Sequence, residues 1–319
     1  MLLHQILDID SDEIIFLSEE SYAGLKNPHR SLDFLKQIAQ SGKTDSEIRA
    51  ISDENGHIMC LAISNPASQD FPSFWGVFTD QVARSGILTP AAGQYEKLVS
   101  RILDDCSTVT TVEASSQELD TALREYLSYA LVERQLCDIC DKPSETYDMV
   151  YMDSRIKRLD DLLIKIEDKF HVSGNVLEIC CGNGMATLPL EKSGIFPLTI
   201  DNDRCQVCQG LEHNVLKPER TIIMDVMRLS HFFNENSFDA VIGFMLGTIY
   251  EFDKEIWTLM MSESLKVVKP GGILLFTLSK YEEMDILKRI LDGLGATGEI
   301  IDNTDASGIY DQWVYLGQK

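Results

Sequence analysis

Short apolar runs alternate with amphipathic segments along the second half of the chain. Five apolar runs have the length of buried strands, at 175–180, 197–203, 220–226, 237–245 and 271–279. Helical periodicity precedes and separates them, and it predicts helices at 154–170, 185–194, 204–214 and 255–268. The last segment, 298–318, predicts two strands with a turn near Asp305–Gly308. This order is typical of an α/β fold, a doubly wound, mostly parallel seven-stranded sheet with a C-terminal antiparallel hairpin.

The first half contains a hairpin signal. Residues 48–64 predict two strands joined across Asn55-Gly56, the dipeptide that most strongly favours a tight β-hairpin. The alternative is a helix over 44–52 that follows a first helix, as in a helix-turn-helix. The acidic surroundings and the lack of a basic recognition helix make this alternative the weaker one.

The other signals of the first half are helical. Helices are predicted at 31–40, 88–105 and 115–136, and Ser115 or Ser116 would cap the last of them. A chain of 319 residues fits two domains. We therefore expect residues 1–145 to form an N-terminal domain, mixed α+β or helical, and residues 146–319 to form the parallel-sheet domain.

Charge narrows the range of partners. The formal net charge is −23, and the acidic excess is spread over both halves of the chain. An evenly acidic surface repels phosphate groups, so neither a nucleic acid nor an anionic membrane is an expected partner. The N-terminus is acidic by Asp8 and lacks the basic stretch of a secretion signal, and no apolar stretch is long enough to cross a membrane. A cytoplasmic protein is expected.

Eight cysteines include two CxxC pairs, Cys137/Cys140 and Cys205/Cys208. A four-cysteine zinc ribbon places its pairs about 15–20 residues apart, whereas 64 residues separate these. The second pair also falls on a predicted helix with ordinary i, i+3 spacing. We expect no metal site and reduced, structural cysteines.

The most informative segment is 176–190, VLEICCGNGMATLPL. A predicted strand ends there in a loop that carries Gly182 and Gly184 and then enters a helix. Glycine accepts a positive φ and leaves room for a ligand beside the backbone, because it has no Cβ. Two glycines after a strand are common, so the loop gains meaning from the features that follow it.

Several landmarks occur in a characteristic order. Glu178 begins the run Glu-Ile-Cys-Cys-Gly-Asn-Gly, Asp201 and Asp225 end the next two predicted strands, and 238–239 and 268–272 read Phe-Asp and Val-Lys-Pro-Gly-Gly. In this order residues 147–319 resemble the class I S-adenosylmethionine-dependent methyltransferases. The family's first motif is acidic-x-Gly-x-Gly-x-Gly, and Cys180 stands here in place of its first glycine.

The resemblance implies S-adenosylmethionine as the cofactor. Glu178 would hold its methionyl ammonium group through water or the loop backbone, and the Phe244 carbonyl would be the other contact of that group. Asp225 would accept from its adenine amino group, and the Val226 amide would donate to its adenine ring. Asp201 would accept both ribose hydroxyls. The expected cofactor-binding set is Glu178, Cys180, Gly182, Asn183, Gly184, Asp201, Asn202, Asp225, Val226 and Phe244.

Each carboxylate also has a plainer interpretation. Ligands of open α/β sheets bind beyond the carboxyl ends of the strands, where these residues fall. Asp201 would otherwise cap the next helix, although Asn202 and Asp203 could also do so. Asp225 would otherwise be a solvated loop residue, and Glu178 would otherwise only orient the loop. A dinucleotide site is disfavoured, since Thr187 stands where its third helix-entry glycine belongs.

Methyl transfer requires an acceptor, and the sequence does not name one. The resemblance places the acceptor side after the fourth strand, where Thr248, Tyr250 and Glu251 are weak catalytic candidates, and Tyr147 and Tyr151 match a segment that folds over the cofactor. No Asn-Pro-Pro-Tyr run or Pro-Cys nucleophile points to a nucleobase. We expect a methyltransferase of a small molecule, with residues 1–145 as a substrate cover. The alternatives are a non-catalytic protein that binds the cofactor or its product and uses 1–145 as an interaction module, and a protein methyltransferase.

Overall fold

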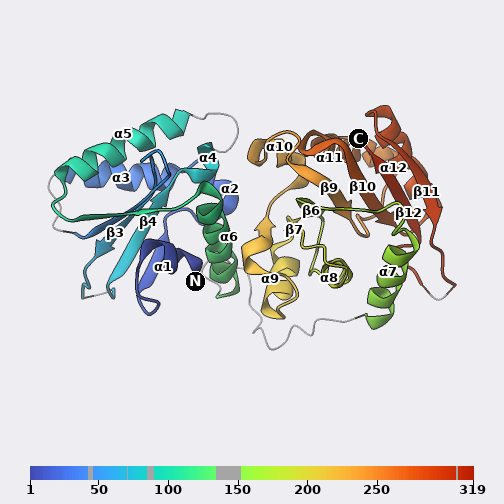
Figure 1. Cartoon of the computed structure of the whole chain (residues 1–319), viewed down its shortest axis with the longest axis horizontal. Coiled ribbons are helices and arrows are strands. Elements are labelled where there is room, and N and C mark those ends of the chain that lie inside the picture. The colour runs from blue at the N-terminus through green and yellow to red at the C-terminus, as the bar shows by residue number, and fades with distance from the viewer. Residues whose placement is uncertain (42–45, 70, 85–89, 134–151, 307) are drawn as a thin grey trace. The chain divides into compact units, whose positions relative to one another are not determined.

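The computed structural model describes residues 1–41, 46–69, 71–84, 90–133, 152–306 and 308–319 (Figure 1). The chain divides into two compact units, Met1–Asp138 and Ile139–Lys319. The boundary predicted between residues 145 and 146 lies outside the described residues, as do Cys137, Cys140, Tyr147 and Tyr151. None of the helices in the described ranges has the length and apolar character needed to span a membrane.

The first unit is built on a five-stranded mixed sheet in the order β1-β4-β3-β2-β5. Its three central strands are antiparallel, and the edge strands β1 and β5 pair in parallel with β4 and β2. Its elements are α1 (Leu2–Leu7), β1 (Ile14–Leu17), α2 (Tyr22–Leu25), α3 (His29–Ser41), β2 (Ile48–Ser52), β3 (Ile58–Asn65), β4 (Phe74–Thr79), α4 (Gln81–Arg84), α5 (Pro90–Asp105), β5 (Val109–Glu113) and α6 (Ser116–Val132). This is the mixed α+β form of the predicted domain.

Helices cover both faces of this sheet. Figure 1 shows α3 and α5 side by side on one face, with α1 and α6 on the other. Leu35 of α3 and Tyr95 of α5 are fully buried against Leu61 of β3. Ser115 caps α6 through a capping box with Glu118, as one of the two predicted caps.

The predicted hairpin is confirmed. Ala50 of β2 lies opposite Leu61 of β3 in an antiparallel register, and the turn has Gly56 at a φ of 77°. Only glycine adopts that conformation without strain, which explains the Asn-Gly signal. The alternative helix over 44–52 is wrong for Ile48–Ser52, because those residues form β2.

The second unit is the predicted seven-stranded sheet, in the order β11-β12-β10-β9-β6-β7-β8. The five strands from β10 to β8 are parallel, and β12 pairs antiparallel with β10 and β11. Its elements are α7 (Asp153–Lys165), β6 (Val176–Ile179), α8 (Thr187–Lys192), β7 (Leu198–Asp201), α9 (Arg204–Glu212), η2 (Pro218–Arg220), β8 (Thr221–Ile223), η3 (Val226–Arg228), α10 (Leu229–Phe232), β9 (Phe238–Gly243), η4 (Glu251–Asp253), α11 (Lys254–Val267), β10 (Val268–Leu278), α12 (Tyr281–Gly293), β11 (Thr297–Asp302) and β12 (Trp313–Gln318). Helix α12 is an addition to the predicted elements.

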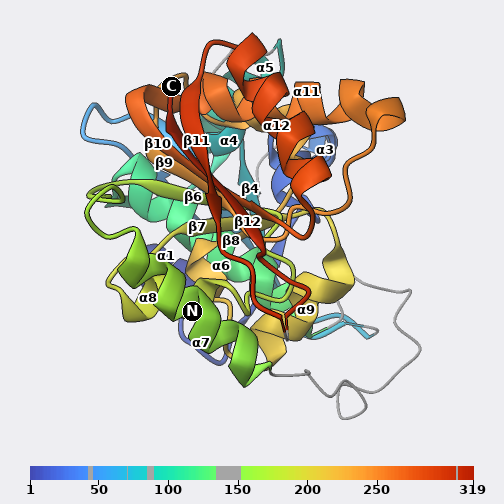
Figure 2. The same cartoon turned by 90° about the vertical axis from the view of Figure 1, so that its right-hand side faces the viewer.

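The two faces of this sheet have separate helical layers. Leu162 of α7 and Leu190 of α8 join a buried apolar cluster with Ile242, Leu275 and Val314 of the sheet. On the other face α11 and α12 pack together, and Figure 2 shows α12 alongside the β10–β12 strands. Strands β7 and β8 are added on one side of β6, whereas β9 and β10 are added on its other side. Ligands of such folds bind beyond the carboxyl ends of the strands, at the point where the strand order reverses.

Candidate functional site

Three acidic residues come together at the carboxyl ends of β6, β7 and β8. These strands are neighbours in the sheet, so Glu178, Asp201 and Asp225 follow one another along its edge. Adjacent strands lie about 4.8 Å apart, which places the outer two strand ends within roughly 10 Å of each other. The three residues therefore lie close together along one edge of the sheet.

The loop after β6 has an unusual backbone. Cys180, Gly182 and Gly184 have φ angles of 54°, 55° and 79°. A Cβ on Gly184 would lie 2.5 Å from the Leu216 side chain, so this glycine is required for packing. A Cβ on Gly182 would meet nothing closer than Gln206, at 3.9 Å, so this glycine faces open space. Gly182 therefore leaves the backbone accessible to a ligand.

Cys180 adopts a conformation that usually belongs to glycine. A left-handed φ costs an L-residue about 1–2 kcal/mol, which fits the glycine at this position in the family motif. Burial raises the pKa of the Cys180 thiol to about 12, and the Asp201 and Asp225 carboxylates add to the effect. The thiol is neutral at physiological pH and is not a nucleophile.

Asp201 holds the loop, and Asp203 caps the helix. The two Asp201 carboxylate oxygens accept hydrogen bonds from the Gly182 and Asp203 amides, each at 2.8 Å. Asp203 accepts from the first-turn amides of α9, Cys205 and Gln206, at 3.0 and 3.1 Å. A carboxylate oxygen has two lone pairs, so each Asp201 oxygen can accept a further hydrogen bond. Asn202, between them, is exposed.

Asp225 follows β8 and begins the short helix η3. Its Oδ1 accepts from the Met227 amide at 2.9 Å, and the residue is half-buried. The neighbouring Val226 side chain is buried, as is Phe244 directly after β9. Asp225 is therefore an ordered turn carboxylate with a second oxygen that the turn does not use.

Glu178 is the most perturbed group of the site. The residue is 1% exposed, its Oε2 accepts from the Thr187 hydroxyl at 2.7 Å, and its Oε1 has no hydrogen-bond partner among the described residues. Burial raises the pKa of Glu178 to about 8, opposed by the Thr187 hydrogen bond and the Arg155 charge and aided by Glu191 and Asp201. A buried polar atom without a partner requires an explanation, and a donor group on a bound ligand could supply one.

A family model matches the chain over the strands that carry these residues. Residues 176–272 match the family model described as "Methyltransferase domain". The C-terminal unit contains a class I methyltransferase domain. The predicted family resemblance is confirmed.

Curated relatives match part of the chain. The chain is 34% identical over 98 residues to demethylmenaquinone methyltransferase from Corynebacterium glutamicum, which covers 30% of this chain and 38% of that protein. The chain thus spans less than half the length of the curated relatives it matches.

Solved structures include similar chains. A SAM-dependent methyltransferase from Archaeoglobus fulgidus has 14% identity and a TM-score of 0.39, over 51% of this chain and 94% of that one. Magnesium protoporphyrin IX methyltransferase from Synechocystis, solved with bound SAM, has 16% identity and a TM-score of 0.41, over 63% and 97%.

The three catalytic candidates lie beyond β9 of the methyltransferase domain. Thr248, Tyr250 and Glu251 are exposed, and the Tyr250 ring stacks on Phe252 at 5.1 Å with an interplanar angle of 12°. Glu251 accepts a hydrogen bond from Arg289 of α12 at 2.6 Å, which lowers the pKa of Glu251. Glu251 is therefore an ionised side chain that joins this segment to α12.

Several ordered polar residues of the domain were absent from the sequence prediction. Thr187 binds Glu178, and Arg155, Thr277 and Asp311 form a hydrogen-bonded group near the end of β9. Thr187 could have been found, because it is the first residue of the helix that follows the glycine loop. Asp311 carries no local signal, since its partners are 34 and 156 positions away in the sequence.

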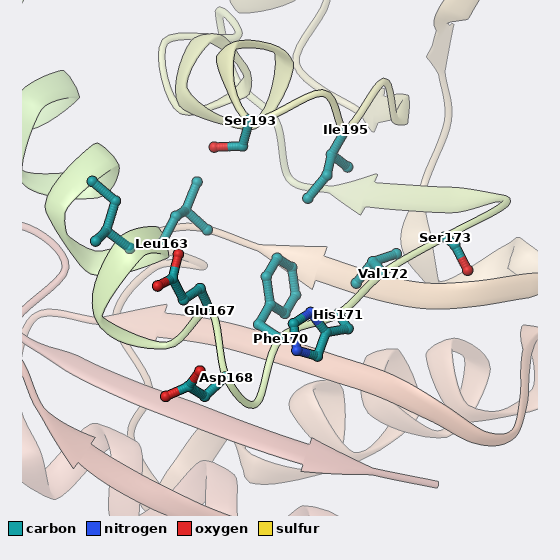
Figure 3. A pocket seen from close by; sticks show the side chains of 10 residues that line it. Leu163, Glu167, Asp168, Phe170, His171, Val172, Ser173, Ser193 and Ile195 are labelled. Atoms are coloured by element: carbon teal, nitrogen blue, oxygen red, sulfur yellow. The ribbon is translucent and has the colours of Figure 1, made fainter.

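A separate pocket lies at the opposite edge of the sheet. Its volume is about 600 Å³, and Figure 3 shows its lining side chains. They come from the segments before β6 and before β7, between Leu163 and Ser173 and from Ser193 to Ile195. These segments meet the amino ends of the strands, so the pocket is distinct from the carboxylate site.

Proposed function

We propose that this protein is an S-adenosylmethionine-dependent methyltransferase that acts on a small molecule. The observation that carries the proposal is the buried Oε1 of Glu178, on the strand before the glycine loop, which has no hydrogen-bond partner in the part of the chain that the structure describes. A buried carboxylate oxygen without a donor fits a ligand with an ammonium group. Gly182 offers an accessible backbone beside it, and Asp201 and Asp225 have unused acceptor capacity along the same edge.

The residues of the site fit the cofactor part by part. Glu178 and the Phe244 carbonyl would bind the ammonium group, Asp201 the ribose hydroxyls, and Asp225 with the Val226 amide the adenine. Cys180, Gly182, Asn183 and Gly184 would shape the loop beneath the cofactor, and Asn202 would lie beside the ribose. When bound, the cofactor supplies an electrophilic methyl group on its sulfonium, and the protein supplies orientation and electrostatics.

The acceptor side is proposed at the exposed segment after β9. Tyr250 and Phe252 are 49% and 84% exposed and form a stacked pair, a surface suited to an apolar or aromatic molecule. The relative named demethylmenaquinone methyltransferase also favours a small acceptor. Tyr250, Thr248 and Glu251 remain the proposed acceptor-side residues, and the Arg289 ion pair makes Glu251 a poor general base.

The proposal includes the setting of the enzyme. The net charge of −23 supports the exclusion of nucleic acid and anionic membranes as partners. Cys60, Cys106, Cys180 and Cys181 are not joined in disulfides, which supports the reducing cytoplasm. Residues 1–145 are proposed as the substrate cover, with an interaction module as the alternative.

Transfer of a labelled methyl group tests this function. Purified protein, tritium-methyl-labelled cofactor and cell extract should give label in the small-molecule fraction, and Asp201→Ala should give much less. Label in the protein fraction would indicate a protein methyltransferase. Binding of the cofactor without transfer to any fraction would indicate the non-catalytic alternative.

A further inference from the structure

Asp311 is the centre of a buried polar group at the end of β9. It is fully buried in the loop before β12, and its Oδ2 accepts from Arg155 Nε of α7 at 2.8 Å. Its Oδ1 accepts from the hydroxyl of Thr277, on β10, at 2.5 Å. The Asp311 amide in turn donates to the Met245 sulfur at 3.2 Å. Four separate segments of the methyltransferase domain are thereby tied together.

Thr277 also binds the backbone of the segment that follows β9. Its Oγ1 accepts from the Met245 amide at 2.8 Å, and its carbonyl accepts from the Leu246 amide at 3.3 Å. A hydroxyl has one proton, and Thr277 gives that proton to Asp311 because an ion-paired carboxylate only accepts. The oxygen lone pairs are therefore held toward Met245.

The geometry of one peptide bond links this contact to the cofactor site. The Met245 N–H and the Phe244 carbonyl belong to the same planar trans peptide, so they point in opposite directions. Strand β9 lies between β10 and β6, and the Met245 N–H points toward Thr277 on β10. The Phe244 carbonyl must then point toward the β6 side, where Glu178 and the glycine loop lie.

Backbone strain marks the same place. Met245 and Asp311 have φ angles of 51° and 52°, in the left-handed region that costs an L-residue about 1–2 kcal/mol. Two such residues in direct contact persist only where surrounding interactions hold them, and such strain concentrates at functional sites.

We propose that Thr277 and Asp311 are positioning residues that direct the Phe244 carbonyl toward the cofactor's ammonium group. This inference rests on the proposed function. Arg155 balances the Asp311 charge and also acts on Glu178, whose pKa it lowers against the larger effect of burial. The two groups assigned to the ammonium, Glu178 and the Phe244 carbonyl, are thus supported by one connected set of side chains.

Two ligands separate positioning from general support of the fold. S-adenosylhomocysteine has the ammonium group, and 5′-methylthioadenosine has the same nucleoside without it. Thr277→Val should weaken binding of the first about tenfold, the size expected for one poorly aimed charge-assisted hydrogen bond. It should leave binding of the second within about twofold. Thr277→Ser, which keeps the hydroxyl, should bind both ligands with the affinity of the parent protein.

Matched variants complete the test. Thr199→Val removes another buried strand hydroxyl, on β7, and should not change the ratio of the two affinities. Asp311→Asn keeps an acceptor for the Thr277 hydroxyl but removes the negative charge. It should weaken binding of S-adenosylhomocysteine relative to 5′-methylthioadenosine by about threefold. This variant keeps the test valid if Thr277→Val folds poorly. Equal loss for both ligands, or no loss, would overturn the inference. A folded parent protein that binds neither ligand would instead overturn the proposed function.

Discussion

Asp201→Ala is expected to weaken binding of S-adenosylhomocysteine about tenfold to a hundredfold. The Asp201 carboxylate lies at the end of β7 with spare acceptor capacity toward the site, and two ribose hydroxyls would each donate a charge-assisted hydrogen bond to it. Such bonds contribute about 1.5–3 kcal/mol each before losses, and roughly 1.4 kcal/mol corresponds to a tenfold change in affinity. Calorimetric titration measures the change directly.

The neighbouring residues provide the controls. Asp203→Ala removes the cap of α9 and should lower the melting temperature, at a cost of about 1 kcal/mol, while the affinity stays unchanged. Asn202→Ala changes an exposed side chain and should have little effect on stability, and it serves as a control for stability alone because Asn202 belongs to the proposed cofactor-binding set. Parent-like affinity in Asp201→Ala would show that this strand end is not a ribose site, and the role of Asp201 would then be to hold the Gly182 and Asp203 amides.

Glu178→Gln is expected to abolish a proton release that accompanies cofactor binding. With a pKa of about 8, the buried Glu178 carboxyl is mostly protonated at pH 7. An ammonium ligand binds the ionised form, so close to one proton should leave per ligand bound at this pH. Calorimetry in two buffers with different ionisation enthalpies measures that number. In Glu178→Gln it should fall to near zero, and the affinity should fall about tenfold or more.

In the unliganded protein, the raised pKa of Glu178 should make the free energy of unfolding depend on pH. The pKa of Glu178 is raised in the folded state, so the folded chain binds more protons than the unfolded chain between about pH 4.5 and 8. The Glu178 contribution to the free energy of unfolding is therefore full below this range and is lost as the pH rises through 8. Glu178→Gln should remove this slope, as measured by denaturation in urea at several pH values.

Glu263 is the matched control for Glu178. It is also buried, at 4% exposed, but the hydrogen bonds from Lys266 and Ser230 outweigh the effect of burial and lower its pKa. Glu263→Gln should keep the proton release of the parent protein. A parent protein that binds S-adenosylhomocysteine without releasing a proton at pH 7 would contradict the predicted coupling between ligand binding and ionisation of Glu178.

The parallel sheet could be predicted because its strands carry their own signal. Strands β6 and β9 are buried on both faces, and a short apolar run identifies such a strand without knowledge of its partners. Helix α12 has a similar signal, with Met284, Leu287 and Leu291 buried at helical spacing, although the sequence prediction does not include it. The edge strand β1 is different, since it is four residues long and pairs in parallel with β4 about sixty positions later.

The candidate site likewise contains residues whose positions follow from the sequence and contacts that do not. Glu178, Asp201 and Asp225 could be predicted, because each sits at or next to a strand end and parallel strand ends share one edge of the sheet. The pairing of Thr277 with Asp311 could not, because it depends on where the loop before β12 folds back onto β10. The orphaned oxygen of Glu178 likewise follows from burial in three dimensions, which the sequence pattern does not contain.

Calorimetric titration of the purified parent protein with S-adenosylhomocysteine tests the central claim most directly. We expect saturable binding with one ligand per chain, and a melting temperature that rises with ligand concentration, as for any ligand that binds only the folded state. Circular dichroism on the same sample establishes that the protein is folded. A folded protein that binds neither S-adenosylhomocysteine nor S-adenosylmethionine would contradict the assignment of this site.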